Sequence, residues 1–244
     1  MNALKGKVAW ITGGGSGIGR SVAKMFCMHG AKVAISGRSE EKLQAVAQEF
    51  GAGTQLTCHA LDVADKDQVQ KVARDVVKQH GPIDILVNNA GTNLKDRRFR
   101  SLTPEGWDKL IRTNLDGAFY CIHAVLESML ERKSGFIVNV SSIAGKRASP
   151  LGGTAYSASK FGMTSLGLCL GMEEKDSGVR VTNIYPGEVD TPILEMRPNP
   201  VSDEHRQQIL QADDVASAVV FVCSLPPRAS VPELIIKPTT QAYG

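Results

Sequence analysis

Two hydrophobic periodicities alternate along the whole chain. Short apolar runs, typical of strands buried on both faces, occupy residues 7–12, 32–36, 54–61, 83–87, 135–140, 179–184 and 234–236. Apolar residues recur at helical spacing in residues 20–30, 39–50, 65–80, 103–132 (as one or two helices), 155–175 and 213–224. Repeated strand–helix units predict an α/β fold in which helices cover both faces of a parallel sheet.

The same pattern predicts one domain spanning residues 1–244. A chain of 244 residues with 42% hydrophobic content can bury one sizeable core. No internal linker, low-complexity tract or short-period repeat interrupts the alternation. The proline-rich, polar interval at residues 192–202 predicts a mobile loop rather than a domain boundary.

Composition excludes several classes of function. The net charge is only +3 and no long basic run occurs, which argues against a nucleic-acid partner. No apolar run approaches the ~20 residues of a membrane span, and the first residues enter a strand directly without a signal-peptide pattern. The cysteines form no CxxC pair and have no histidine at metal-ligand spacing, which argues against a zinc site and a secreted disulfide framework. A cytoplasmic protein without metal or membrane contact is therefore predicted.

A glycine-rich turn links the first strand to the first helix. Gly13, Gly17 and Gly19 allow a tight turn, so that backbone amides at the helix N-terminus can approach a pyrophosphate. Ser16 and Ile18 complete this predicted binding turn. Such turns also occur for packing reasons alone, but the position between a strand and a helix favours a dinucleotide.

The residues after the second and third strands bear on the choice of dinucleotide. The second strand ends in Ser36, Gly37 and Arg38, without the carboxylate that usually accepts the ribose 2′-hydroxyl of NAD. A guanidinium suits a 2′-phosphate, so NADP(H) is predicted, with a solvated arginine as the alternative. Asp62 and Val63 are expected at the adenine ring, although Asp62 could instead cap the next helix.

Tyr156 and Lys160 combine a phenol and an ammonium on one helix face, because they are four residues apart. A phenol titrates near ~10 in water, and a neighbouring cation is expected to lower that pKa. The pair therefore predicts an activated acid. The alternative is a half-buried tyrosine with a lysine extending past it to solvent.

The order of several motifs resembles the short-chain dehydrogenase/reductase family from end to end. They are TGGGSGIG at 12–19, NNAG at 88–91, Asn114, Ser142, YSASK at 156–160 and YPGEVDT at 185–191. The resemblance implies a three-layer, doubly wound Rossmann fold with a seven-stranded parallel sheet. It also implies a homotetramer, or a homodimer, formed through the helices that begin near residues 103 and 155.

The resemblance also implies catalytic roles. Tyr156 looks like the general acid/base, Lys160 like the ligand of the nicotinamide ribose, and Asn114 like a member of the same relay through a bound water. Ser142 resembles the serine that hydrogen-bonds the substrate oxygen. Ser141 lies next to it, but the glycine three residues after Ser142 matches the turn of the family.

Two further segments are placed against the cofactor by this resemblance. The residues of the first segment, expected along the adenosine side of the cofactor, are Asn89, Ala90 and Gly91. The residues of the second, expected to face the nicotinamide carboxamide, are Pro186, Gly187, Val189 and Thr191.

The substrate is suggested by charge and by the C-terminal region. Lys146, Arg147, Arg197 and the loop at 92–100 carry cations that would favour an anionic substrate, unless they are simply solvated. The tail is similar to that of NADP-dependent serine and 3-hydroxy acid dehydrogenases, and the loop at 191–213 is short. These features predict an NADP(H)-dependent enzyme that interconverts a carbonyl and a secondary alcohol on a small 3-hydroxy or 3-oxo acid. The alternatives are a 3-oxoacyl thioester reductase and a non-catalytic nucleotide sensor.

Overall fold

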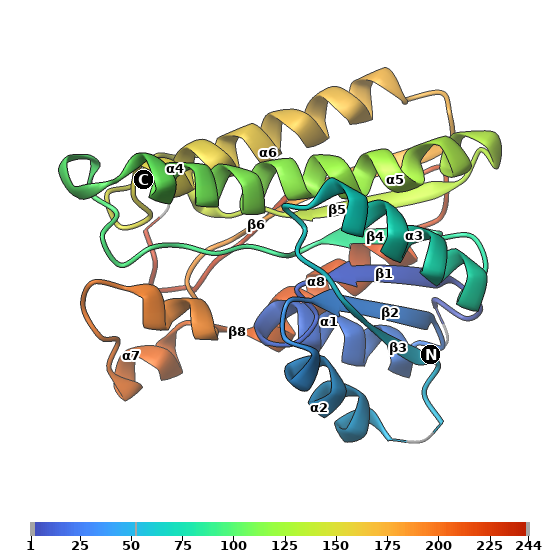
Figure 1. The fold of residues 1–244 in the computed structure, drawn as a ribbon, viewed down its shortest axis with the longest axis horizontal. Helices are drawn as coiled ribbons and strands as arrows, with labels where there is room; N and C mark the ends of the chain where they lie inside the picture. Colours follow the sequence, from blue (N-terminus) through green and yellow to red (C-terminus); the bar gives the residue numbers. More distant parts are fainter. Residues whose placement is uncertain (1–2, 52, 243–244) are drawn as a thin grey trace.

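One seven-stranded parallel sheet runs through the computed structural model, which describes residues 3–51 and 53–242 (Figure 1). Its strand order is β3-β2-β1-β4-β5-β6-β9. The strands are β1 (Val8–Thr12), β2 (Lys32–Gly37), β3 (Leu56–Ala60), β4 (Ile85–Asn88), β5 (Gly135–Val140), β6 (Val179–Pro186) and β9 (Glu233–Ile236). The predicted α/β fold class and the seven-stranded sheet are confirmed.

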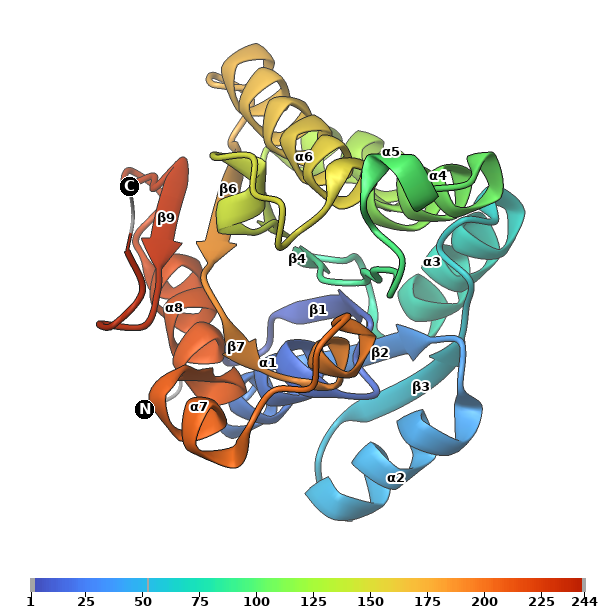
Figure 2. The same cartoon turned by 90° about the vertical axis from the view of Figure 1, so that its left-hand side faces the viewer.

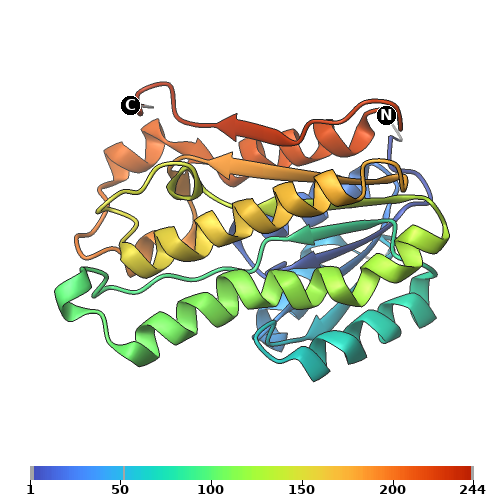
Figure 3. The same cartoon turned by 90° about the horizontal axis from the view of Figure 1, so that it is seen from above.

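Helices cover both faces of this sheet and complete the three layers (Figures 1 and 3). One face carries α1 (Gly17–Met28), α2 (Glu40–Phe50) and α8 (Ala212–Ser224). The other carries α3 (Lys66–His80), α4 (Pro104–Ile111), α5 (Gly117–Glu131) and α6 (Thr154–Glu173). Within the described residues, no helix is both long and apolar enough to cross a bilayer.

Strand β1 shows why the central strands are apolar at successive positions. Ala9 and Ile11 belong to the hydrophobic cluster under α1 and α8, whereas Val8 and Trp10 belong to the cluster under α3 and α5. Both side-chain directions of the strand are therefore buried. The indole Nε1 of Trp10 donates a hydrogen bond of 3.0 Å to Ser36 Oγ on β2, so this buried polar group is satisfied.

The region predicted as one or two helices at 103–132 is a continuous helical run with an irregular centre. A π-helical stretch, Arg112–Asp116, joins α4 to α5 and places Asn114 in the interior. Such a turn inserts a residue without ending the helix. Gly117 follows it, and a Cβ there would lie 2.6 Å from Val63 Cγ2, so the helix packs directly on the loop after β3.

The interval at 192–202 contains more structure than the predicted loop. It begins with a 3₁₀-helix, Pro192–Met196, and leads into α7 (Asp203–Gln208). The two-residue strands β7 (Val189–Asp190) and β8 (Leu210–Gln211) pair in parallel and close the segment at its base. These elements are too short to show a periodicity in sequence.

A ladder of buried asparagines crosses three central strands. Asn88 Nδ2 donates to Asn139 Oδ1 at 3.0 Å, and Asn139 Nδ2 donates to Asn183 Oδ1 at 3.0 Å. Asn183 Nδ2 then donates to the carbonyl oxygen of Thr164 on α6 at 3.1 Å. The ladder joins the sheet to α6 through hydrogen bonds from which water is excluded.

Replacing Asn139 with alanine should lower the free energy of unfolding by about 2–4 kcal/mol, because two buried amides lose a partner at once. Urea unfolding followed by circular dichroism measures this change. Gln44→Ala, on the exposed face of α2, is the control and should change the value by less than about 0.5 kcal/mol. A similarly small effect of Asn139→Ala would show that the ladder does not stabilise the fold.

Candidate active site

The candidate site lies at the carboxyl ends of β1 and β4, where the strand order reverses (Figure 2). Thr12 Oγ1 accepts hydrogen bonds from the backbone N–H groups of Asn89 (3.1 Å) and Ala90 (3.0 Å). Asn89 Nδ2 in turn donates to the carbonyl oxygens of Thr12 and Gly13. The turns that follow these two strands are thereby fixed against each other.

A cavity of about 500 Å³ opens at this point and contains most of the predicted site. Its lining includes every residue predicted for the cofactor or for catalysis except Gly19 and Asn114. The members are Gly13, Ser16, Gly17, Ile18, Arg38, Asp62, Val63, Asn89, Ala90, Gly91, Ser142, Tyr156, Lys160, Pro186, Gly187, Val189 and Thr191. Segments far apart in sequence thus meet around one space.

Two glycines of the binding turn have backbone angles that favour glycine. Gly13 and Gly17 have φ values of +68° and +51°. Gly19 does not line the cavity: a Cβ there would lie 2.3 Å from the carbonyl oxygen of Gly13, so it allows α1 to pack closely on the turn. Ser16, at the N-cap, makes no side-chain cap, which leaves the first amides of α1 available to an anionic ligand.

Arg38 is accompanied at the far end of the cavity by two polar residues that sequence reasoning missed. Ser39 and Lys42 also line the cavity, and Ser39 Oγ accepts the backbone N–H of Lys42 at 3.3 Å as the cap of α2. The serine N-cap with a lysine three residues later was a usable signal. Asp62 Oδ1 accepts the backbone N–H of Ala64 at 3.0 Å, whereas Asp65 caps α3, so the capping alternative for Asp62 is wrong.

Ser142 and Tyr156 lie together on the opposite side of the cavity. Ser142 follows β5, and its Oγ accepts the backbone N–H of Ala144 at 3.1 Å. A hydrogen bond from Ser142 to Tyr156 favours the phenolate. Ser141 instead donates to the carbonyl oxygen of Lys160 at 3.2 Å. Of the two serines, Ser142 is therefore the one that faces the phenol.

The electrostatics of Tyr156 differ from the prediction. Burial raises its pKa, and the hydrogen bond from Ser142 and the charge of Arg97 offset this only in part. Lys160 Nζ lies 5.8 Å from the ring centroid and donates to the carbonyl oxygen of Val140 at 2.9 Å. Burial also lowers the pKa of Lys160 to about 8. The prediction of a lowered phenol pKa is wrong because desolvation outweighs the hydrogen bond from Ser142 and the charge of Arg97.

Asn114 lies behind the cavity wall. Its Oδ1 accepts the backbone N–H of Thr92 at 2.8 Å, and its Nδ2 donates to the carbonyl oxygen of Thr92 and to Ser159 Oγ. The Cβ position built on Gly91 lies 3.6 Å from both Asn114 Oδ1 and Lys160 Nζ. The two groups therefore lie on either side of the same small space beside Gly91.

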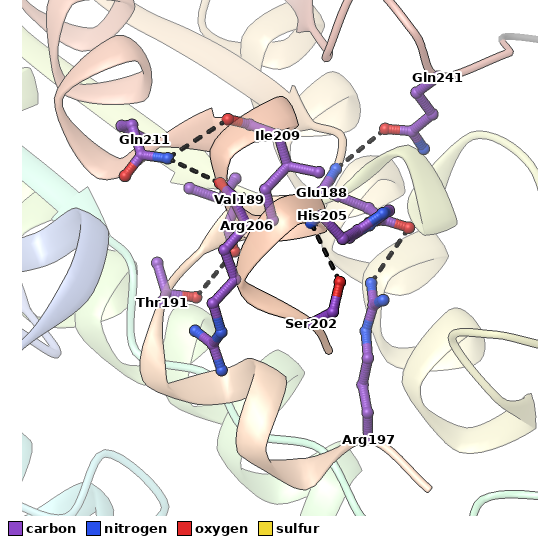
Figure 4. Close-up of polar contacts among 10 residues, drawn as sticks. All are labelled: Glu188, Val189, Thr191, Arg197, Ser202, His205, Arg206, Ile209, Gln211 and Gln241. Atoms are coloured by element: carbon purple, nitrogen blue, oxygen red, sulfur yellow. Dashed lines mark hydrogen bonds and ion pairs between the residues drawn. The ribbon is translucent and has the colours of Figure 1, made fainter. Parts of the chain in front are cut away.

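Residues 188–211, which we call the lid, form one wall of the cavity through their first part. Glu188 holds this segment together: Arg197 Nη2 lies 3.2 Å from its Oε1, and His205 Nε2 contacts its Oε2 (Figure 4). The backbone N–H of Glu188 donates to Gln241 Oε1 at 3.0 Å. Burial raises the pKa of Glu188, but His205 and Arg197 more than reverse this, so the carboxylate is favoured.

The cations predicted near the mouth of the site separate in the structure. Arg197 lines the cavity, but Lys146 does not, because its Nζ pairs with Glu233 Oε1 of β9 at 2.6 Å. Arg97, from the loop predicted to carry cations, also lines the cavity and is buried. Within residues 3–51 and 53–242, no group of three histidine, cysteine or acidic side chains could hold a metal ion.

Known proteins match this sequence over most of its length. The family model described as short chain dehydrogenase matches residues 7–200. An uncharacterized oxidoreductase of Staphylococcus saprophyticus is 36% identical over 240 residues, which cover 98% of this chain and all of the relative. This chain therefore belongs to the short-chain dehydrogenase family, an oxidoreductase class, as its motifs predict.

Solved structures agree with this assignment. A closed form of serine dehydrogenase complexed with NADP+ has a TM-score of 0.89 and 32% identity, covering 97% of this chain and 96% of its own. A 3-ketoacyl-(acyl-carrier-protein) reductase from Brucella melitensis, complexed with NADH, has a TM-score of 0.88 and 30% identity, covering 96% and 98%. The family thus includes relatives of similar fold with different named substrates.

Proposed function

We propose that this protein is an NADP(H)-dependent oxidoreductase that interconverts a carbonyl group and a secondary alcohol. The observation that carries the proposal is the placement of Ser142, Tyr156 and Lys160 in one cavity with the glycine turn and the open N-terminus of α1. A purely nucleotide-binding sensor would have no use for a half-buried phenol beside a serine and a lysine.

Each of these residues has a chemical task in the proposed reaction. In reduction, Tyr156 gives its proton to the carbonyl oxygen, to which Ser142 donates a hydrogen bond. NADPH, when bound, supplies the hydride that reaches the carbonyl carbon. Lys160 binds the ribose and stabilises the phenolate left on Tyr156, and a water between Lys160 and Asn114 returns the proton. Oxidation runs these steps in reverse.

The preference for NADP(H) is supported by the charges at the adenosine end. Arg38 and Lys42 line that end of the cavity. Ser39, which follows Arg38, is the N-cap of α2, the helix that contains Lys42. Two cations and a hydroxyl form a suitable environment for a phosphate ester. The NADP+ complex of the serine dehydrogenase agrees with this choice, although the reductase from Brucella melitensis was solved with NADH.

Arg38→Ala should raise the KM for NADPH by about 10- to 100-fold, because a charge-assisted contact to the 2′-phosphate is lost. The KM for NADH should change by less than about threefold, since NADH lacks that phosphate. Titration of both cofactors at a fixed substrate concentration measures the two values. Arg74→Ala, exposed on α3, is the matched control. Equal losses for both cofactors would contradict the role given to Arg38.

For the substrate, we propose a small 3-hydroxy or 3-oxo acid. Arg97 and Arg197 both line the cavity, together with the apolar side chains of Leu194 and Met196 from the lid. A 3-oxoacyl thioester is the second candidate, supported by the likeness to the 3-ketoacyl-(acyl-carrier-protein) reductase. A panel of serine, allo-threonine, 3-hydroxybutanoate and a 3-oxoacyl thioester, followed at the nicotinamide absorbance, separates them. Turnover of the thioester alone would overturn the first choice.

We further propose that the chain is one catalytic domain that assembles through the face formed by α4, α5 and α6. Large apolar side chains remain exposed there in the monomer, at Trp107, Phe119 and Phe161. Such a face fits the homotetramer, or homodimer, implied by the family resemblance. Light scattering of the purified protein gives the assembled mass, and a monomer at micromolar concentration would refute this proposal.

A cytoplasmic location is also proposed. All five cysteines are free thiols, and burial raises the pKa of Cys27 to about 11, which keeps that thiol unreactive. Free thiols suit a reducing compartment. Cell fractionation with an antibody against the protein tests this location.

A further inference from the structure

Arg97 joins three loops that are distant in sequence. Its Nε donates to the carbonyl oxygen of Leu94 at 2.8 Å and its Nη1 to that of Leu151 at 2.9 Å. Its Nη2 donates to the carbonyl oxygen of Met196 in the lid. The guanidinium therefore lies where the loop after β4, the loop before α6 and the lid meet. Arg97 as a whole is only 7% exposed.

The backbone around Arg97 is equally constrained. Gly153, the N-cap of α6, has a φ of +84°, and a Cβ there would lie 2.6 Å from Arg97 Cβ. Tyr156 follows three residues later on the same helix. Arg97 is thus held at the start of the helix that carries the phenol, and its charge is close enough to lower the pKa of Tyr156 in part.

The charge of Arg97 has no carboxylate partner in the described part of the chain. Its protein contacts are three neutral carbonyl oxygens, whereas the neighbouring Arg197 pairs with Glu188. A buried cation without a counter-ion is costly unless an anion joins it. One N–H remains on each terminal nitrogen after the three carbonyls are satisfied, and the side chain lines the cavity that contains Tyr156 and Ser142.

We propose that Arg97 binds the carboxylate of the substrate and thereby determines specificity for acids over neutral alcohols and ketones. This inference rests on the proposed oxidoreductase function and adds the group that recognises the acid. Arg97 fixes one end of a short hydroxy acid, and Tyr156 and Ser142 meet its oxygen at the other. Arg197, which follows Met196 on the lid, adds a second positive charge whose own counter-ion is Glu188 (Figure 4).

The test compares 3-hydroxybutanoate with its methyl ester as substrates for oxidation by NADP+. The wild type should prefer the acid, and Arg97→Met should lower kcat/KM for the acid by roughly 10- to 150-fold, mainly through KM. The ester should change by less than about threefold because it offers no charge to the guanidinium. Arg98→Met is the control: Arg98 is the exposed neighbour and does not line the cavity, so both substrates should keep their wild-type values.

Arg97 also ties three loops together, so a structural role predicts a different pattern. Equal losses for acid and ester, or a wild type without preference for the acid, would overturn the inference while leaving the oxidoreductase function intact. If neither compound and no member of the substrate panel were turned over, the result would instead contradict the proposed function. Thermal unfolding identifies variants that do not fold. In that case Arg97→Lys, which keeps the charge, should retain a preference for the acid, and its loss would count against the inference.

Discussion

Tyr156→Phe should reduce turnover of the best substrate by about 10³-fold in both directions, because it removes the group that gives and takes the proton. The phenyl ring remains, so the packing around it should be preserved and NADPH should bind with an affinity within about threefold of wild type. Initial rates followed at the nicotinamide absorbance measure the first effect, and fluorescence titration of NADPH measures the second.

Tyr120→Phe provides the matched control, since Tyr120 lies on α5 and does not line the cavity. It should keep the wild-type rate. Turnover by Tyr156→Phe at more than about a tenth of that rate would show that another group carries the proton.

The raised pKa of Tyr156 also gives the direction of the pH dependence. Reduction needs the protonated phenol, which burial favours, so its rate should stay constant through neutral pH. Oxidation needs the phenolate, so its rate should increase as the pH rises toward the pKa of the phenol. An oxidation rate that is highest near pH 6 and falls above it would contradict this assignment.

The parts of the site that could be predicted from sequence are those built by short, continuous segments. The glycine turn and the Tyr156–Lys160 spacing each occupy a few residues whose local structure follows from periodicity and glycine placement. The strand order that brings these segments together is a property of the whole fold. The family resemblance implied a doubly wound sheet of seven strands, and the structure has one.

The remaining parts depend on contacts between distant loops, which leave no local pattern. Arg97 meets Leu151 and Met196, which are 54 and 99 residues away. Glu188 meets His205 across the lid. The sign of the pKa shift of Tyr156 was wrong for a similar reason: the spacing to Lys160 is visible in sequence, whereas the extent of burial is set by the packed fold.

The burial of Lys160 also affects the stability of the fold. Its pKa is lowered from 10.5 to about 8, because burial disfavours the ammonium. The unfolded chain therefore binds more protons between pH 8 and 10.5, so the stability of the wild type should increase with pH across this window. At neutral pH the folded state bears the full penalty, on the order of 3 kcal/mol.

Lys160→Met should consequently stabilise the fold at pH 7 by about 1–3 kcal/mol, after allowing for the lost hydrogen bond to Val140. Turnover should fall by about 10²- to 10³-fold, because the cation that supports the phenolate is gone. Urea unfolding at pH 7 measures the gain in stability. Repeating it at pH 10 shows whether the variant has lost the increase of stability with pH that is expected for the wild type.

Lys175→Met, exposed just beyond α6, should change neither property and is the control for a lysine-to-methionine substitution. A destabilisation by Lys160→Met of 2 kcal/mol or more would mean that the contacts of the ammonium outweigh its desolvation. If Lys160→Met is more stable but inactive, the ammonium of Lys160 serves catalysis and lowers the stability of the fold.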